Sequence, residues 1–169
     1  MCAMKLSRYN SLLDELESKS IYIIREAYYE YKDSLAILWS MGKDSTTLVH
    51  LARKAFFGVI PFPVIHIDTT FKFKQIYQFR DRYAKQWNLK LIIAKNDVAL
   101  KEGMSPEKGR FNCCNALKTE ALKQVIEKYN FKALLVGIRR DEHTLRAKER
   151  YFSPRDKNFK WNYQNQPLE

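Results

Sequence analysis

Long apolar runs are missing from this sequence: none can cross a membrane as a helix, and residues 1–5 lack the apolar core of a secretion signal. Cysteine is scarce, with three residues of which two are adjacent, and this excludes a disulfide framework. Histidine and cysteine do not occur at the spacing of a zinc site, so no metal site built from these residues is expected. These absences predict a globular cytoplasmic protein that contacts no membrane.

The composition indicates a folded domain with a basic surface. Hydrophobic residues make up 46% and aromatic residues 14% of the 169 residues, which is enough for one domain with a core. The formal net charge of +11 suits an anionic ligand, an acidic partner or nucleic acid. The sequence shows no RNA-binding signature and no long Lys/Arg run. A basic nucleic-acid-binding module therefore stays only as an alternative of another class.

The most informative stretch is the hexapeptide Ser-Met-Gly-Lys-Asp-Ser at 40–45. It follows an apolar run at 35–39, which predicts a strand, and it opens a helical pattern over 46–57. This order predicts an anion site, because the loop presents backbone N–H groups and the helix N-terminus adds the positive end of its dipole. A Walker A loop is excluded, since that motif requires Ser or Thr directly after its Gly-Lys pair.

Each polar residue of this loop has an expected role. Gly42 lets the backbone approach a ligand closely or adopt a positive φ. Lys43 supplies a mobile positive charge, while Ser40 and Ser45 supply hydroxyl donors. Asp44 has two interpretations, as a cap of the helix or as a ligand of a Mg²⁺ ion that arrives with the phosphates.

Short apolar strands alternate with amphipathic helices along the chain. The later strands are predicted at 64–67, 89–94 and 133–136. This alternation predicts an α/β fold with a parallel twisted sheet and helices on both faces, in which ligands bind at the carboxyl ends of the strands. The nucleotide-binding α/β domain is expected to cover 1–150. Residues 151–169 lack periodicity and are expected to begin an irregular C-terminal region that continues in a longer chain.

Other candidate site residues follow two of these strands. Asp68 is expected to bind a ribose hydroxyl or to cap a helix, and His66 is expected to be a buried core residue. Arg139 and Arg140 are expected either to grip an anion in bidentate fashion or to pair with the acidic residues beside them. Arg146 is expected to extend an anion-binding wall or to face water.

The hexapeptide resembles the PP-loop of ATP pyrophosphatases, which cleave ATP between its α- and β-phosphates. With the run from Gly137 to Arg155 and the stretches 16–26, 61–69 and 117–124, the chain resembles the small, ATP-binding subunit of bacterial sulfate adenylyltransferase, within the phosphoadenylylsulfate reductase superfamily. The family's chains are considerably longer.

This resemblance implies a Rossmann-like adenine nucleotide alpha hydrolase fold, ATP with Mg²⁺ and sulfate as ligands, and a GTPase large subunit as partner. It implies a nucleotidyltransferase reaction, in which a sulfate oxygen attacks the α-phosphorus to give adenylyl sulfate and pyrophosphate. The residues expected to act in catalysis are Lys43, Arg139 and Arg140. The residues expected to hold the nucleotide are Ser40, Gly42, Lys43, Asp44, Ser45, Asp68 and Arg146.

One departure from the family pattern concerns two adjacent cysteines. Cys113 and Cys114 stand where the family usually has a His-Thr-Asp type of sequence. They resemble the reductase branch of the superfamily, in which some members bind an iron–sulfur cluster, although such a cluster needs about four thiolates. A reductase or a sulfur-transfer enzyme that uses this pair is therefore the alternative function, and inert packing of both thiols is the third interpretation.

Overall fold

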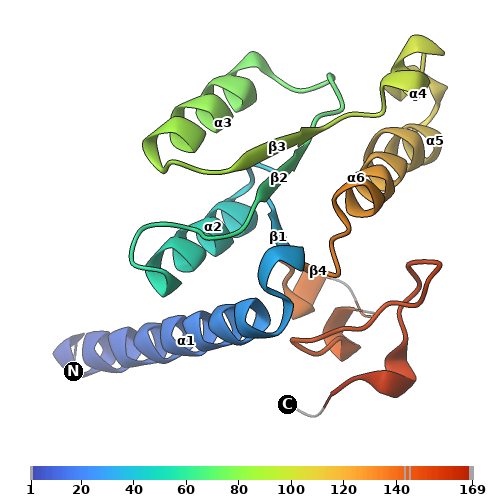
Figure 1. Cartoon of the computed structure of the whole chain (residues 1–169). Helices are drawn as coiled ribbons and strands as arrows, with labels where there is room; N and C mark the ends of the chain where they lie inside the picture. Colours follow the sequence, from blue (N-terminus) through green and yellow to red (C-terminus); the bar gives the residue numbers. More distant parts are fainter. Residues whose placement is uncertain (1, 143, 145, 168–169) are drawn as a thin grey trace. The chain divides into compact units, whose positions relative to one another are not determined.

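The computed structural model describes residues 2–142, 144 and 146–167, except for the side chains of residues 2–10 and of Arg140. The α-helices are α1 (Cys2–Tyr31), α2 (Lys43–Ala55), α3 (Lys74–Gln86), α4 (Asp97–Lys101), α5 (Arg110–Cys114) and α6 (Ala121–Tyr129). The strands are β1 (Leu35–Leu38), β2 (Val64–Ile67), β3 (Leu91–Ala94) and β4 (Ala133–Leu135). Each predicted strand is therefore present, with small differences at the ends (Figure 1).

The strands form one parallel 4-stranded sheet in the order β3-β2-β1-β4. In the register, Ile37 of β1 lies opposite Val64 of β2 on one side and Leu135 of β4 on the other. The chain moves outward from β1 to β2 and β3 and then returns to the other side of β1. Sheets of this kind bind ligands at the carboxyl ends of the strands, where the strand order reverses. The loop that follows β1 lies at this point of reversal.

Helices cover both faces of the sheet, as predicted (Figure 1). On one face, Ala36 and Ile65 pack with Val125 of α6. On the other face, the ring of Trp39 lies 6.2 Å from that of Phe79 in α3. Successive residues of a strand point to opposite faces, so β1 buries side chains on both. Full burial of one large apolar side chain contributes roughly 1.5–3 kcal/mol, so the buried residues of β1 and β2 anchor the centre of the sheet.

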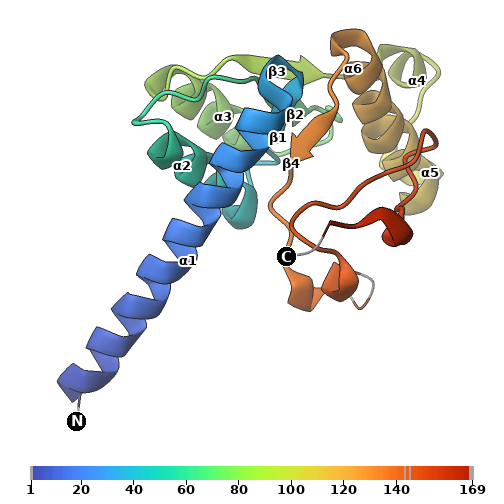
Figure 2. The ribbon, with the colours of Figure 1, turned by 60° about the horizontal axis from the view of Figure 1, so that its bottom comes forward.

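Helix α1 packs on α2 through its second half. Glu17 forms an ion pair of 2.6 Å with Lys54, and Arg25 Nε donates to the carbonyl of Ala55 at 2.8 Å. The first half extends away from the sheet (Figure 2). Exposed leucines on this helix are Leu12, Leu13 and Leu16.

The connection between β3 and β4 contains α4, α5, a π-helical stretch at Asn115–Glu120, and α6. The Asn96 side chain accepts from the N–H of Ala99 at 3.2 Å and donates to the carbonyl of Ala116 at 2.9 Å. This amide therefore joins the end of β3 to the π-helical stretch. Such stretches often occur at functional sites.

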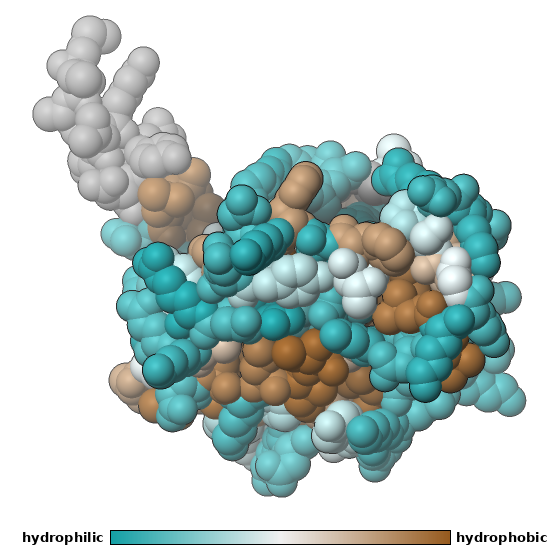
Figure 3. All heavy atoms as spheres, turned by 90° about the horizontal axis from the view of Figure 1, so that it is seen from above, coloured by the Kyte–Doolittle hydropathy of each residue, from teal (hydrophilic) through white to brown (hydrophobic). Residues whose placement is uncertain are grey.

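The edge strand β3 is less covered than the central strand. Figure 3 shows one face of the molecule, where an area of hydrophobic side chains is bordered by hydrophilic ones. Leu35, Ala36 and Ile37 of β1 are buried, whereas Ile93 of β3 is 44% exposed. Among the described residues, no helix is long and apolar enough to span a bilayer.

The chain divides into two compact units, one up to Val136 and one from Gly137. The second unit contains short 3₁₀ turns, at Arg140–Glu142, Arg146–Lys148 and Tyr163–Asn165. An antiparallel bridge joins Arg155 to Trp161 in this unit. The expected boundary of the nucleotide-binding domain after residue 150 of this chain stays a prediction.

Candidate functional site

The loop after β1 presents the start of α2. Gly42 is the N-cap residue of this helix, and the first helical hydrogen bond runs from the N–H of Thr46 to the carbonyl of Gly42 at 2.9 Å. The N–H groups of residues 43–45 precede that bond, so the helix itself does not satisfy them. The Nε1–H of Trp39 donates to the Thr46 hydroxyl at 3.0 Å and fixes the helix to the strand end. Three consecutive N–H groups therefore point out of a rigid strand–loop–helix junction.

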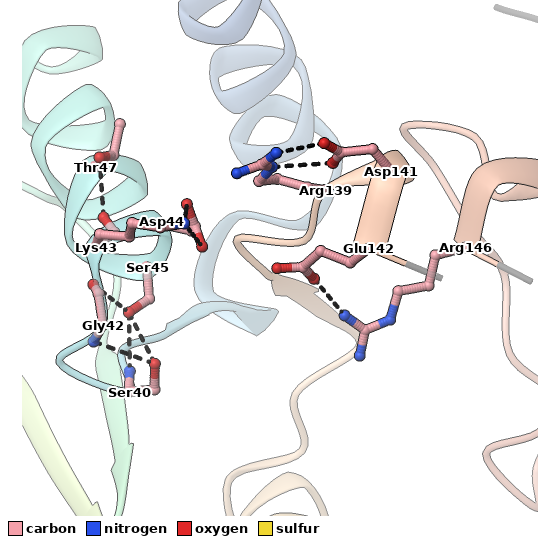
Figure 4. A network of polar contacts seen from close by, with 10 residues as sticks. All are labelled: Ser40, Gly42, Lys43, Asp44, Ser45, Thr47, Arg139, Asp141, Glu142 and Arg146. Carbon is pink, nitrogen blue, oxygen red and sulfur yellow. Dashed lines mark hydrogen bonds and ion pairs between the residues drawn. The ribbon is translucent and has the colours of Figure 1, made fainter. Parts of the chain in front are cut away.

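The two serines of this loop contact each other but have different roles (Figure 4). Ser45 is buried, and its hydroxyl donates to the Gly42 carbonyl at 3.1 Å. It also accepts from the Ser40 N–H at 3.2 Å and lies 3.0 Å from the Ser40 hydroxyl. The single proton of the Ser45 hydroxyl is already donated, so Ser45 holds the loop shape. Ser40 is exposed, and its hydroxyl can turn toward a ligand.

The positive φ predicted for Gly42 occurs one residue earlier. Met41 has φ +69°, whereas Gly42 has φ −78°, a value open to any residue. That part of the prediction is wrong, because the sharp turn needed to start α2 is made at Met41. A Cβ at position 42 would meet the Ser40 Oγ at 3.4 Å, an ordinary contact. The close approach of a ligand at Gly42 stays a prediction.

Lys43 and Asp44 bind each other in the first turn of α2 (Figure 4). Lys43 Nζ lies 2.8 Å from both Asp44 carboxylate oxygens. The Lys43 side chain is 74% exposed, so this ion pair is weak and easily exchanged for another anion. The helix-cap interpretation of Asp44 is wrong, because Gly42 occupies the cap position. The Mg²⁺ interpretation stays a prediction.

At the end of the neighbouring strand β2, Asp68 is the centre of a buried polar network. Its carboxylate, 6% exposed, accepts from the Thr70 N–H at 2.8 Å and the Tyr77 hydroxyl at 2.9 Å, and lies 3.2 Å from Lys95 Nζ. Burial disfavours its charged form, but these three donors prevail and lower the pKa of Asp68. The helix-cap interpretation is wrong here too, because Phe73 precedes α3 as its cap residue. The predicted contact with a ribose hydroxyl stays a prediction.

His66 is fully buried and satisfied, as predicted. Its Nδ1 lies 2.9 Å from the Trp39 carbonyl and its Nε2 lies 3.1 Å from Lys72 Nζ. The carbonyl can only accept and the ammonium can only donate, so Nδ1 carries the proton. Burial lowers the pKa of His66, which agrees with a neutral ring. The imidazole therefore joins Lys72 to the strand end that directly precedes the 40–45 loop.

Lys72 was not among the predicted site residues. Its Nζ donates to the Ile67 carbonyl at 2.6 Å as well as to His66. Burial lowers the pKa of Lys72 to about 8; Asp68 opposes this shift, and Lys118 and Arg80 add to it. The available sequence signal was a lysine between two aromatic residues directly after a strand end, in Phe-Lys-Phe at 71–73.

Arg80 completes the network from α3. It exposes only 8% of its surface, and its Nε donates to Asp81 at 2.7 Å. Its Nη1 lies 4.0 Å from the Asp68 carboxylate and is a buried donor without a hydrogen-bond partner among the described residues. We refer to His66, Asp68, Lys72, Tyr77, Arg80 and Lys95 together as the Asp68 cluster.

Two of the predicted arginines in the second unit pair with acidic neighbours. Arg139 forms an ion pair with Asp141, and Arg146 lies 2.9 Å from Glu142 (Figure 4). The Arg139 contact matches the expectation of pairing with an adjacent acidic residue, whereas the pairing of Arg146 with Glu142 was not predicted. The side chain of Arg140 lies outside the described residues. A role of any of these arginines at an anion stays a prediction.

Cys113 and Cys114 lie on the short helix α5, directly before the π-helical stretch. Both are free and half-buried. Within the described residues, no three His, Cys, Asp or Glu side chains gather as a metal site.

Solved structures with low sequence identity share the fold. A phosphoadenylyl-sulfate reductase from Candida auris in a phosphate complex has a TM-score of 0.60 at 21% identity, over 74% of this chain and 66% of that one. NH₃-dependent NAD synthetase from Campylobacter jejuni has a TM-score of 0.55 at 16% identity, over 73% of this chain and 54% of that one. FMN adenylyltransferase from Candida glabrata has a TM-score of 0.58 at 16% identity, over 87% of this chain and 49% of that one. The chain thus has a Rossmann-like adenine nucleotide alpha hydrolase fold.

Curated relatives are much closer in sequence. "Sulfate adenylyltransferase subunit 2" of Photobacterium profundum is 46% identical over 91% of this chain and 51% of its own length. The protein of the same name from Psychromonas ingrahamii is 47% identical over 96% of this chain and 54% of its own length. The chain therefore spans about half the length of these relatives.

A family model agrees with these relatives. The model of the phosphoadenosine phosphosulfate reductase domain matches residues 34–169, which include every strand and all predicted site residues. On this match, the chain belongs to the phosphoadenosine phosphosulfate reductase domain family.

Proposed function

We propose that this chain is the ATP-binding part of a sulfate adenylyltransferase, which forms adenylyl sulfate and pyrophosphate from ATP and sulfate. The observation that carries the proposal is the 40–45 loop, where the N–H groups of residues 43–45 and a mobile Lys43 meet at the point of strand reversal. Relatives named sulfate adenylyltransferase subunit 2, at 46% identity, support the transferase over the reductase.

The chemistry asks for positioning and charge neutralisation rather than covalent help. A sulfate oxygen attacks the α-phosphorus, the bond to the α,β-bridging oxygen breaks, and its electron pair leaves with pyrophosphate. No proton has to move. The N–H groups of residues 43–45 and Lys43 Nζ hold the β- and γ-phosphates, with the Ser40 hydroxyl beside them, while Ser45 keeps the loop closed. Gly42 allows the phosphates to approach the backbone.

Lys43 must exchange its partner when ATP binds. Its ammonium leaves Asp44 for a phosphate, which carries more charge, and the Asp44 carboxylate is then available to Mg²⁺. The carboxylate is 35% exposed, and Mg²⁺ in nucleotide sites typically takes one or two carboxylates together with phosphates and water, so this residue fits the ion. When bound, Mg²⁺ would neutralise charge on the leaving pyrophosphate.

The remaining roles follow from the same reaction. Arg139 and Arg140 would bind the α-phosphate or the sulfate, Arg146 would extend that wall, and Asp68 would contact the ribose. Because the relatives are named as subunit 2, we propose a large subunit as partner, with GTPase activity that drives the unfavourable synthesis, and a cytoplasmic location.

Calorimetry tests the proposal directly. Mg-ATP is titrated into the chain, into Lys43→Ala, and into Lys54→Ala as a matched control at the other end of α2. Loss of a charge-assisted contact should weaken ATP binding by about tenfold or more in Lys43→Ala only. Sulfate-dependent release of pyrophosphate is the second assay. Equal ATP affinity of wild type and Lys43→Ala would refute the role of the loop, and tighter binding of 3′-phosphoadenylyl sulfate than of ATP would favour a reductase that uses Cys113 and Cys114.

A further inference from the structure

The Asp68 cluster carries more positive than negative charge. Lys95 and Arg80 lie 3.2 and 4.0 Å from the Asp68 carboxylate, and Lys72 is bonded to the carbonyl of the neighbouring Ile67. Asp81 is bonded to Arg80 Nε at 2.7 Å. Lys118, from the π-helical stretch, acts on Lys72 with a further positive charge. Asn96 holds that stretch against the end of β3 through the Ala116 carbonyl.

Among the described residues, hydrogen bonds account for two of the three N–H donors of Lys72. An ammonium group has three N–H donors. Two of them go to neutral acceptors, the Ile67 carbonyl at 2.6 Å and His66 Nε2 at 3.1 Å, so contact with them does not neutralise the charge. Arg80 adds a buried Nη1 donor that has no hydrogen-bond partner among the described residues. Two donors from different elements thus lie beside one carboxylate that is already bonded.

We propose that the Asp68 cluster, together with Lys118, binds the tetrahedral oxyanion that attacks ATP, with Lys72 as the contacting residue and His66 as its positioning residue. The proposal rests on the proposed function for the identity of the anion, sulfate. It assigns the acceptor to the carboxyl ends of β2 and β3, in the first unit, and leaves to Arg139 and Arg140 the other of their two proposed ligands, the α-phosphate.

The position relative to the 40–45 loop favours the acceptor over the phosphates. The loop already supplies N–H groups and Lys43 for the leaving pyrophosphate. One imidazole ring connects Lys72 to the Trp39 carbonyl, directly before that loop, so the two positive sites are neighbours but separate. A dianion that attacks an anionic triphosphate needs positive charge at both ends of the displacement, because the reactants repel each other.

Sulfate titration tests the inference. Sulfate is titrated calorimetrically into the full chain with and without saturating α,β-methylene ATP, for wild type, Lys72→Met, Lys118→Met and the control Lys85→Met. Lys85 is exposed at the far end of α3, and its replacement by Met removes the same charge as Lys72→Met does. Sulfate should bind about tenfold or more weakly to Lys72→Met, more weakly also to Lys118→Met, and unchanged to Lys85→Met, while the affinity for the ATP analogue stays nearly constant. Thermal unfolding of each variant confirms that it is folded.

Each contrary result is distinct. Equal sulfate affinity of wild type and Lys72→Met overturns the inference, and so does loss of the ATP analogue in Lys72→Met with sulfate unaffected, because the cluster would then serve the nucleotide. If the analogue fails to bind wild type, the proposed function fails. The sulfate affinities of wild type and Lys72→Met without the analogue then still show whether the Asp68 cluster binds the anion. If wild type binds the analogue but no sulfate, the inference alone is overturned.

A pH series separates a contact by Lys72 from a general effect of charge. Lys72 must be protonated to bind a dianion, and its pKa is about 8 in the free chain, with Asp68, Arg80, Lys95, Lys118 and His66 as its charged or titratable neighbours. Sulfate affinity of wild type should therefore fall between pH 7 and pH 9, roughly around that value. The affinity of Lys72→Met should not show this fall, and a parallel fall in both would contradict the contact.

Discussion

Replacing Asp68 by Asn removes the buried negative charge at the end of β2 while keeping the shape of the side chain. The carboxylate is 6% exposed and accepts from Thr70, Tyr77 and Lys95. Loss of one partner from a buried charge pair costs roughly 3–5 kcal/mol. Lys95 is 40% exposed and can turn to water, so we expect the lower end, a loss of about 3 kcal/mol in the free energy of unfolding. This is a large share of the roughly 5–15 kcal/mol that stabilise a domain.

Urea unfolding at pH 7, followed by tryptophan fluorescence, measures this loss. Asp81→Asn is the matched control, because Asp81 is 61% exposed and its ion pair with Arg80 should contribute at most about 1 kcal/mol. The transition midpoint should fall with an unchanged slope. A loss of less than about 1 kcal/mol in Asp68→Asn would refute the view of Asp68 as the electrostatic centre of the cluster.

The pH dependence provides a second check. The pKa of Asp68 is lowered from 3.8, so the folded state favours the carboxylate. Its contribution is fully present above the unfolded pKa and is lost as pH falls through the folded pKa. The difference in unfolding free energy between wild type and Asp68→Asn should therefore be constant from about pH 5 to 7 and narrow below about pH 4. A difference that grows on acidification would contradict the assigned direction.

Three further predictions concern the loop, Lys72 and a helix end. Gly42→Ala should change the unfolding free energy by less than about 1 kcal/mol, because φ is −78° and the atom nearest to the new Cβ is Ser40 Oγ at 3.4 Å. The same variant should weaken ATP binding in calorimetry, and unchanged binding would contradict a close approach of phosphate. Because the pKa of Lys72 is lowered from 10.5 to about 8, the unfolded chain binds more protons than the folded chain between about pH 8 and 10.5. Urea unfolding should therefore show that wild type gains stability relative to Lys72→Met as pH rises over that range. Asn130 ends α6 with φ +53°, so Asn130→Ala should lower the unfolding free energy by about 1 kcal/mol and Asn130→Gly should not; equal effects would contradict a conformational cause.

The sequence alone determined the sheet and the position of the 40–45 loop. Apolar runs and helical spacing are local patterns, and they predicted every strand of the sheet, its parallel arrangement and its helix-covered faces. The 40–45 loop was predictable for the same reason, because a strand, a glycine and a lysine before a helix lie next to one another in the chain. The burial of His66 also followed from its place in an apolar strand.

Only the tertiary structure decided the detailed roles within the site. The bond of His66 to the Trp39 carbonyl joins neighbouring strands, and the donation by Lys95 to Asp68 joins two strand ends. Such pairs are set by strand order and register, which no local pattern contains. Even inside the loop, the positive φ falls on Met41 rather than on Gly42, and Trp39 holds Thr46 of α2 at the end of β1. Lys72 was missed because a lysine in a turn is ordinarily a solvated charge, and only the fold places this one between a buried imidazole and a backbone carbonyl.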